Sequence, residues 1–233
     1  MKTEILIQAR ADSKRLPNKI MLKLAGKSLI EHVYQRCMST GYKTVILTSD
    51  NKSDDKFCEF LKKNQIPFFR GPLQNVLERY LIYANKNSLH SLIRVTGDNP
   101  LIDFRKIILF KKLSDKVEYS AITGGAIGTG CEYVRVSSLK KQLDYNMNED
   151  YKEHVTLCIR KNPHDFIIKN IPGDDRFTGL RFTVDEKDDY NTLNKVYNLL
   201  YKGIPIENDE LFEALKKQPE LFAGNKNVKQ NKI

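Results

Sequence analysis

The chain has 233 residues, of which 40% are hydrophobic and 29% are charged, with 12 glycines and 8 prolines. This composition excludes a fibrous, collagenous or largely disordered protein, and the length suffices to bury a core without disulfides or structural metals. The apolar runs fall far short of the roughly 18 residues that a membrane-spanning helix needs, so we expect no membrane crossing. The first residues lack the apolar core of a signal peptide, which predicts a cytoplasmic protein.

Lys and Arg number 39 against 29 Asp and Glu, which gives a net charge of +10. A nucleic acid or a polyanionic small molecule would suit this balance. The lysines, however, are spread along expected helix faces, which favours a solvated surface, and we expect no nucleic-acid partner. The four cysteines are scattered without a C-x-x-C pair. Each is therefore expected to be a buried small hydrophobe rather than a zinc ligand or half of a disulfide.

Short β-branched runs alternate with longer amphipathic stretches through the first hundred residues. This order is typical of α/β proteins, in which βα repeats build a mostly parallel sheet between layers of helices. The pattern predicts strands at 5–7, 44–48, 66–69 and 91–96, and helices at 28–40, from 51–55 onward and at 73–87.

The second half is less regular, and we expect some antiparallel pairing there. The pattern predicts helices at 104–113, 150–161 and 187–201, and strands at 119–123, 132–136, 166–171 and 181–184. Neither a linker nor an internal repeat divides the chain. We therefore predict a single mixed domain over residues 1–223, followed by a disordered Asn- and Lys-rich tail at 224–233.

The first expected strand runs into a basic loop, residues 8–19, that carries Arg10, Lys14, Arg15 and Lys19. In open α/β sheets, ligands bind at the C-terminal ends of the strands. A loop wrapped around a phosphate chain can direct Arg10, Arg15 and Lys19 inward, and both residue types bind phosphate oxygens well. A solvated basic loop fits the spacing alone equally well. The P-loop and dinucleotide-binding fingerprints do not occur in the sequence.

Five ordered blocks of the sequence resemble the signatures of the cytidylyltransferase family of CMP-sugar synthetases. They are Gln8-Ala9-Arg10 with Ser13, Arg15-Leu16-Pro17, Lys19 and Leu24-Ala25-Gly26-Lys27, and then the blocks 75–80, 94–102, 153–156 and 181–185. The likeness is greatest to the branch typified by the spore coat polysaccharide biosynthesis protein F, with CMP-Kdo and CMP-sialic acid synthetases as more distant relatives. It implies a single-domain, glycosyltransferase-A-like (Rossmann-like) three-layer α/β fold with a mixed, mostly parallel sheet.

The resemblance also implies a reaction. CMP would pass from CTP to a sugar acid or related small molecule for surface-glycan biosynthesis, by in-line attack of an acceptor oxygen on the α-phosphorus and release of pyrophosphate. Mg²⁺ would be the cofactor and a homodimer the assembly. Phosphoryl chemistry of this kind gains more from positioning and charge neutralisation than from a protein nucleophile. The basic loop agrees with that requirement, because it offers neither an obvious nucleophile nor a base.

Individual roles follow from the same resemblance. Arg10, Lys19 and Asp98 are the expected catalytic residues, and Asp98 and Asp185 the expected metal ligands, since Mg²⁺ takes one or two carboxylates besides phosphate oxygens and waters. A tight turn at Asp98 and a helix N-cap at Asp185 are the structural alternatives. Besides Arg10, Lys19 and Asp98, the residues expected to contact the nucleotide are Gln8, Ala9, Ser13, Arg15, Ser49, Asp50, Arg79, Thr96 and Gly97.

The acceptor would contact Gly130, Glu132 and His154. The related branch usually has Gly-Leu-Asp-Val-Glu where this chain has Gly130-Cys131-Glu132-Tyr133-Val134, which leaves the identity of the acceptor open. A lone helical histidine is also often a packing or capping residue, so His154 has a structural alternative. In the basic loop, Asn18 stands where relatives often have glycine, a mild departure because Asn tolerates the left-handed conformation.

Three alternative functions remain open at this point. The chain could activate a polyol or a phosphorylated small molecule with CTP, bind nucleotides or nucleic acids without catalysis, or bind CTP without turnover. The acid pair Asp98 and Asp185 lies opposite a basic loop, and this arrangement favours a CTP-using enzyme over a nucleic-acid-binding protein. Carboxylates contribute nothing to a nucleic-acid groove, whereas a metal–nucleotide site requires them.

Overall fold

The computed structural model describes residues 1–13 and 15–230; Lys14, one of the expected loop cations, and the last three residues lie outside this description. One sheet runs through it in the strand order β5-β4-β1-β6-β8-β7-β9. Four strands on one side are mutually parallel, β8 is antiparallel to both β6 and β7, and β9 is parallel to β7. The strands of this sheet are β1 (Thr3–Gln8), β4 (Thr44–Ser49), β5 (Phe68–Gly71), β6 (Ser91–Thr96), β7 (Tyr119–Thr123), β8 (Glu132–Arg135) and β9 (Ile171–Pro172), and β2 (Lys23–Leu24) pairs with β3 (Lys27–Ser28) in a separate hairpin.

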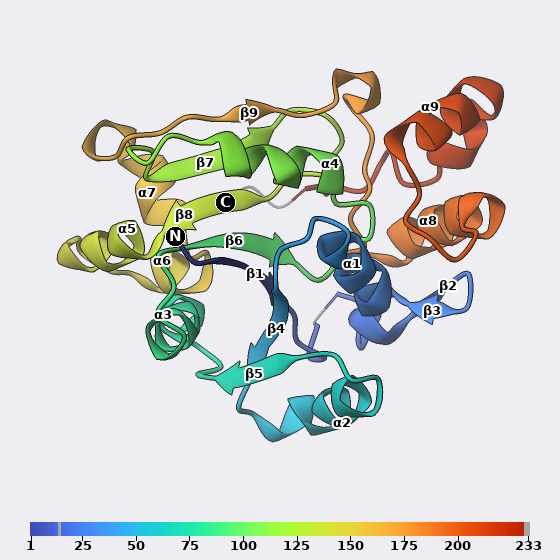
Figure 1. The fold of residues 1–233 in the computed structure, drawn as a ribbon. Coiled ribbons are helices and arrows are strands. Elements are labelled where there is room, and N and C mark those ends of the chain that lie inside the picture. The colour runs from blue at the N-terminus through green and yellow to red at the C-terminus, as the bar shows by residue number, and fades with distance from the viewer. Residues whose placement is uncertain (14, 231–233) are drawn as a thin grey trace.

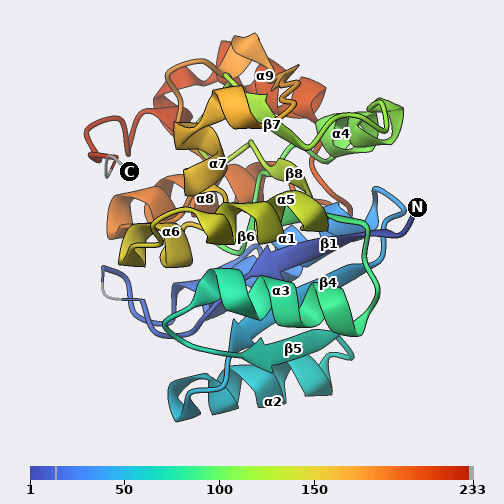
Figure 2. The same ribbon diagram turned by 90° about the vertical axis from the view of Figure 1, so that its left-hand side faces the viewer.

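Helices cover both faces of this sheet (Figure 1). Seen from the side in Figure 2, α3, α5 and α6 lie in front of the sheet, and α1 and α8 lie behind it. The expected three-layer α/β fold with a mixed, mostly parallel sheet is therefore confirmed. The helices are α1 (Leu29–Met38), α2 (Asp55–Lys63), α3 (Val76–Lys86), α4 (Phe104–Ile107), α5 (Val136–Lys141), α6 (Glu149–Glu153), α7 (Leu157–Lys161), α8 (Lys187–Leu200) and α9 (Asn208–Lys217).

The core lies on both sides of the central strand β1, because side chains alternate between the faces of a strand. Ile5 and Ile7 pack in a cluster that includes Leu29 and Val33 of α1, whereas Leu6 packs in a second cluster with residues of α3. The sequence of a strand that is buried on both faces is typically a continuous apolar run, as it is in the middle of β1. The two layers of helices thus hold the C-terminal end of β1 at a fixed position.

The four cysteines are buried on four different elements: Cys37 on α1, Cys58 on α2, Cys131 just before β8 and Cys158 on α7. None forms a disulfide. Burial raises the pKa of all four thiols, to about 12 for Cys37. The expectation that each is a small buried hydrophobe is confirmed.

The second half departs from the predicted elements at several places: α5 was not predicted, and the helix expected at 104–113 is an α-helix only over α4. The helix expected at 150–161 is two short helices, α6 and α7, because Val155 between them has a φ of 45°. Extended residues 181–184 are not a strand, since the bridge from Ile127 to Arg181 is their only β-pairing with another described segment. Likewise, the strand expected at 166–171 is reduced to β9 and a bridge at Ile168.

The sequence analysis overlooked α9 and expected a disordered tail from residue 224 onward. Within that tail, Asn225 is 1% exposed, and its side chain donates hydrogen bonds to Arg181 and Asp189. Up to residue 230 the segment therefore has specific contacts, contrary to the expectation of disorder; 231–233 lie outside the described residues. The single domain over residues 1–223 stays a prediction. None of the helices in the described part of the chain has the length and apolar character needed to cross a membrane.

Candidate active site

A cavity of about 980 Å³ opens at the C-terminal ends of β1 and β6. The strand order reverses between these two strands, and ligands bind at such a crevice in open α/β sheets. Most of the residues expected to form the site line this cavity: Gln8, Ala9, Arg10, Ser13, Arg15, Lys19, Arg79, Thr96, Gly97, Asp98, Gly130, Glu132, His154 and Asp185. Ser49 and Asp50 are not among the lining residues.

Lys19 lies between the two acids that the sequence analysis singled out as metal ligands. Its Nζ is 2.7 Å from Asp98 Oδ2 and 2.9 Å from Asp185 Oδ1. Burial lowers the pKa of this ammonium, but the charges of both carboxylates and their hydrogen bonds outweigh burial, so the pKa is raised. Lys19 is therefore a cation throughout the neutral pH range, held between two carboxylates.

Asp185 is the more enclosed of the two acids and forms ion pairs with three cations. Arg15 Nη2 is 2.8 Å from its Oδ1, and Arg181 Nη2 is 2.8 Å from its Oδ2. Burial raises the pKa of this carboxyl, and the attraction of Lys19, Arg15 and Arg181 more than offsets it, so the pKa is lowered. The N-cap of α8 is Glu186, which removes the alternative that Asp185 is merely a helix cap.

Backbone contacts bring Asp98 and Asp185 together although 87 positions separate them in the sequence. The N–H of Val184 donates to the carbonyl of Asp98 at 2.8 Å, and the N–H of Gly97 donates to Gln8 at 2.8 Å. A Cβ on Gly97 would stand 2.8 Å from the Cβ of Ala9, closer than real Cβ atoms come. Glycine at position 97 therefore permits the end of β6 to lie against the start of the basic loop.

Asp54 fixes the basic loop to the neighbouring strand, a role that the sequence analysis missed. This fully buried carboxylate accepts from the N–H of Ala11 at 2.7 Å, from the N–H of Ser49 at 3.1 Å and from the Ser49 hydroxyl. Ser49 is thereby engaged in holding the loop. Asn18 has a φ of 55°, as the tolerance of Asn for the left-handed conformation led us to expect.

Arg79, an expected nucleotide contact, is engaged with the backbone. Its guanidinium is 1% exposed and donates to the carbonyl of Pro72 at 2.6 Å from Nη2 and 3.1 Å from Nε. It therefore fixes the turn before α3 at the cavity wall. Arg10, by contrast, is 46% exposed at the cavity rim, with Glu153 Oε1 at 3.9 Å from its Nη2.

Glu132 on the acceptor side lies within a set of paired groups. It is directly opposite Arg94 in the β6–β8 pairing, and the two side chains form an ion pair at 2.7 Å. Its other oxygen accepts from Tyr119 at 2.6 Å and Thr156 at 2.8 Å. Burial raises the pKa of Glu132, but Arg94 and these donors lower it overall. His154 is the C-cap of α6 at the cavity wall, and burial lowers its pKa.

The acid pair fits a magnesium–nucleotide site better than a metal site built from protein ligands alone. Both carboxylates lie within 3 Å of one cationic nitrogen, so they converge on a common cation position. Among residues 1–13 and 15–230, no group of three or more His, Cys, Asp or Glu side chains is arranged to hold a metal ion. Two carboxylates leave most of the octahedral positions of Mg²⁺ to phosphate oxygens and waters.

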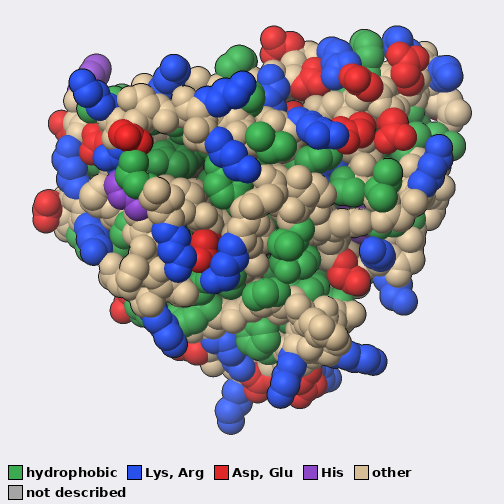
Figure 3. All heavy atoms as spheres, viewed as in Figure 1, with side chains coloured by type: hydrophobic (Ala, Val, Ile, Leu, Met, Phe, Trp, Pro, Cys, Tyr) green, Lys and Arg blue, Asp and Glu red, His purple; other side chains and the backbone are tan. Residues whose placement is uncertain are grey.

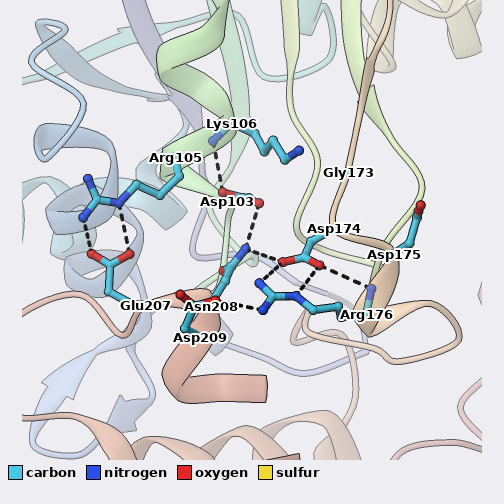
Figure 4. A pocket seen from close by; sticks show the side chains of 10 residues that line it. All are labelled: Asp103, Arg105, Lys106, Gly173, Asp174, Asp175, Arg176, Glu207, Asn208 and Asp209. Atoms are coloured by element: carbon cyan, nitrogen blue, oxygen red, sulfur yellow. Dashed lines mark hydrogen bonds and ion pairs between the residues drawn. The ribbon is translucent and has the colours of Figure 1, made fainter. Parts of the chain in front are cut away.

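A second cavity, of about 650 Å³, lies between the start of α4, the segment after β9 and the start of α9 (Figure 4). Its charges are largely paired: Arg176 is 2.6 Å from Asp174 and 2.8 Å from Asp209, and Arg105 Nε is 3.0 Å from Glu207. Asn208 joins Asp103 to Asp174 across it. These contacts attach α9 to the body of the protein, which gives this cavity a structural role.

Comparison with known proteins agrees with the geometry of the site. The family model described as cytidylyltransferase matches residues 5–230. The chain is 30% identical over 228 residues to the spore coat polysaccharide biosynthesis protein SpsF of Bacillus subtilis (strain 168), covering 92% of this chain and 94% of that protein. It is 40% identical over 52 residues to a 3-deoxy-manno-octulosonate cytidylyltransferase of Coxiella burnetii (strain RSA 493 / Nine Mile phase I), a match to 22% of this chain and 21% of that one.

Solved structures extend the likeness to the whole fold. A cytidylyltransferase from Leptospira borgpetersenii serovar Hardjo-bovis (strain JB197) has a TM-score of 0.90 at 28% identity, with all of both chains covered. A CMP:2-keto-3-deoxy-manno-octonic acid synthetase, solved in complex with CTP, has a TM-score of 0.63 at 19% identity, covering 85% of this chain and 98% of that one. At that identity the second likeness concerns the fold alone.

Proposed function

Because this chain belongs to the cytidylyltransferase family, we propose that it transfers CMP from CTP to a sugar acid or related small molecule, with release of pyrophosphate, in surface-glycan biosynthesis. One observation carries the proposal: Lys19, Asp98 and Asp185 converge in a large cavity at the topological switch point of the sheet. The name of the Bacillus relative supports an acceptor that belongs to polysaccharide synthesis.

Asp98 and Asp185 would hold Mg²⁺, which when bound would neutralise charge on the phosphates of the nucleotide. Lys19 and Arg15 already lie within 3 Å of these acids, so small side-chain movements would bring both cations onto phosphate oxygens. Arg10 and Ser13 would complete the triphosphate site from the outer part of the loop. These residues accelerate in-line attack by positioning the α-phosphorus and by stabilising charge on the leaving pyrophosphate.

The remaining cavity divides into a nucleoside side and an acceptor side. We assign cytosine and ribose to the ends of the parallel strands, and the acceptor to the wall formed by Gly130, Glu132 and His154. The sequence analysis expected nucleoside contacts at Gln8, Ala9, Ser49, Asp50, Arg79, Thr96 and Gly97, and we keep this set as the residues that form or support the nucleoside side. Since Ser49 and Arg79 are engaged with protein groups, they act through the loop and turn that they hold. The expected homodimer and cytoplasmic location stay predictions.

Pyrophosphate release tests the proposed reaction. CTP, UTP, ATP and GTP are each supplied with Mg²⁺ and a panel of sugar acids, other sugars, polyols and phosphorylated acceptors. The proteins compared are the wild type, Asp98→Asn and a matched control, Asp188→Asn. Asp188 is an exposed acid on α8. We expect release with CTP alone, lost in Asp98→Asn and kept in Asp188→Asn.

The acceptor that supports release identifies the substrate class. Release that is equal with all four nucleotides, or that persists in Asp98→Asn, would contradict the proposal. CTP binding without release across the whole panel would instead favour a family member that holds the nucleotide without turnover.

A further inference from the structure

The C-terminal segment, residues 224–230, contacts the groups that hold Asp185. Asn225 is 1% exposed, and its Nδ2 donates to the carbonyl of Arg181 at 3.0 Å and to Asp189 Oδ1 at 2.9 Å. Asp189 is itself fully buried and accepts from the N–H groups of Asp185 at 2.9 Å and Glu186 at 3.0 Å. Asn225 therefore holds the carboxylate that fixes the backbone of Asp185.

Gln230 reaches the same groups from the side of the cavity. It is among the residues that line the proposed active site, and its Oε1 accepts a hydrogen bond from Arg181 Nη1. The other terminal nitrogen of Arg181 is 2.8 Å from Asp185 Oδ2. One guanidinium thus joins the last described residue of the chain to an expected metal ligand.

Four hydrogen bonds hold the guanidinium of Arg181, and each of its three nitrogens donates at least one of them, so its orientation depends on each partner. Nε is 2.8 Å from Asp189 Oδ1, Nη2 bonds both Asp185 and Asp189, and Nη1 bonds Gln230. The side chain is 4% exposed, so water replaces a lost partner poorly. Because the guanidinium is planar and rigid, removing the partner of one terminal nitrogen frees the plane to turn and shifts the other.

We propose that Gln230 and Asn225 are positioning residues that hold Asp185, through Arg181 and Asp189, in the direction required for the metal–nucleotide complex. The inference rests on the metal role that the proposed function gives to Asp185. It makes Asn225 and Gln230 part of the site, although both are separated in the sequence from every expected site residue. Groups that orient a metal ligand commonly change metal affinity by about 10- to 100-fold when removed.

The test measures CTP binding by calorimetry, without acceptor, over a range of Mg²⁺ concentrations. Gln230→Met keeps the length of the side chain but removes the acceptor oxygen, Gln230→Glu restores an acceptor, and Lys229→Ala is the matched control at an exposed neighbour. We expect the Mg²⁺ concentration for half-maximal CTP binding to rise about 10-fold in Gln230→Met and to return toward wild type in Gln230→Glu. Lys229→Ala should behave as wild type.

Thermal unfolding separates positioning from stability. Because Gln230 is exposed and accepts one hydrogen bond, its substitution should lower the unfolding midpoint less than Asn225→Ala, which removes two bonds of a buried side chain and should also raise the Mg²⁺ requirement. An unchanged Mg²⁺ requirement in Gln230→Met, or an equal rise in Lys229→Ala, would overturn the inference while leaving the proposed function in place. Wild-type CTP binding that does not depend on Mg²⁺ would instead overturn the metal role of Asp185, and the inference with it.

Discussion

Lys19 is a cation that contacts both expected metal ligands. Its ammonium is within 3 Å of Asp98 and Asp185, and the burial of all three groups strengthens the attraction. In a nucleotide complex the same side chain would move its charge from carboxylate to phosphate. In the proposed mechanism, Lys19 would therefore influence both the binding of the metal–nucleotide complex and the departure of pyrophosphate.

Replacing Lys19 by Met tests this double role. We expect kcat/KM for CTP to fall about 100- to 1000-fold, the usual cost of losing one preorganised donor to transition-state charge. The control is Lys23→Met, an exposed lysine close by in the sequence, which should change kcat/KM less than about twofold. Steady-state pyrophosphate release gives the answer, and equal rates for the two variants would refute the role of Lys19.

The lowered pKa of Asp185 predicts that the folded protein loses stability in acid. Its pKa is lowered in the folded protein, so the unfolded chain binds that proton more tightly. The stability that this carboxylate contributes is present above its unfolded pKa of about 3.9 and is lost as pH falls through the folded value. Thermal unfolding between about pH 7 and pH 3 should therefore show a smaller acid-dependent drop in Asp185→Asn than in wild type.

The exposed Asp188 provides the comparison for that measurement. Asp188→Asn should retain the full acid-dependent drop of the wild-type protein. If Asp185→Asn lost as much stability in acid as Asp188→Asn, the ion pairs of Asp185 would not contribute to folding. The contribution of Lys19 to stability depends on pH in the opposite direction. Because its pKa is raised in the folded protein, this contribution is complete at neutral pH and is lost only as pH rises through the folded pKa.

At the scale of elements, the position of the basic loop depends on the beginning of α2. Asp54, just before that helix, accepts from Ala11 in the loop and from Ser49 at the end of β4. Three elements thus meet at one buried carboxylate. An amide in its place would offer one acceptor oxygen and would turn an NH₂ group toward a backbone N–H.

Asp54→Asn should consequently cost about 2 kcal/mol in the free energy of unfolding and weaken CTP binding severalfold. Asp55→Asn is a matched control, because Asp55 is 51% exposed and its pair with Arg70 at 2.7 Å lies at the surface. Surface pairs contribute about 0 to 1 kcal/mol. Urea denaturation and calorimetry measure the two effects, and a neutral Asp54→Asn would show that the loop holds its shape without this contact.

The sequence predicted the first half well because each element there is local and regular. Strand β6 was predicted with its observed bounds, and β1 and α1 within about two residues, since apolar periodicity and the capping residues of α1 are adjacent in the sequence. The capping pair Glu207 and Glu210 and the apolar Leu211 and Ala214 were also visible, so α9 could have been found.

Other features could not be found in this way, because they depend on contacts between distant residues. Val155 adopts a positive φ that its branched side chain disfavours, and the burial of this side chain in the α3 cluster accompanies that conformation. No local signal separates Asp54, which holds the loop, from Asp55, which lies at the surface. Most of the expected site residues were placed at one cavity only because family motifs marked them; Arg181, in a matching block, still received no role.

At the scale of the whole molecule, the net charge of +10 is distributed rather than concentrated. On the face that Figure 3 shows, Lys and Arg side chains are interspersed with Asp and Glu and with uncharged surface. Inside the proposed site, Arg15 and Lys19 are paired with acids. Such a distribution supports binding of a small, compact anion more than of an extended polyanion.

The salt dependence of binding tests this distinction. Raising KCl from about 50 to about 200 mM should weaken CTP binding about tenfold or less, whereas a groove that neutralises 6–10 phosphates would lose about 10³- to 10⁵-fold. Titration with a duplex DNA at the higher salt, in competition with CTP, provides the control. Displacement of CTP by that DNA would favour the nucleic-acid alternative.

The four buried cysteines can be used to measure local unfolding of the native protein by thiol labelling. Each lies on a different element, and each has a raised pKa, so a thiol reagent in the native state reacts only when that element opens. The labelling rates of Cys37, Cys58, Cys131 and Cys158 would rank the local stabilities of α1, α2, the start of β8 and α7. Cys131 precedes Glu132 at the cavity wall, so its protection by nucleotide and acceptor would report the occupation of the site without an engineered cysteine.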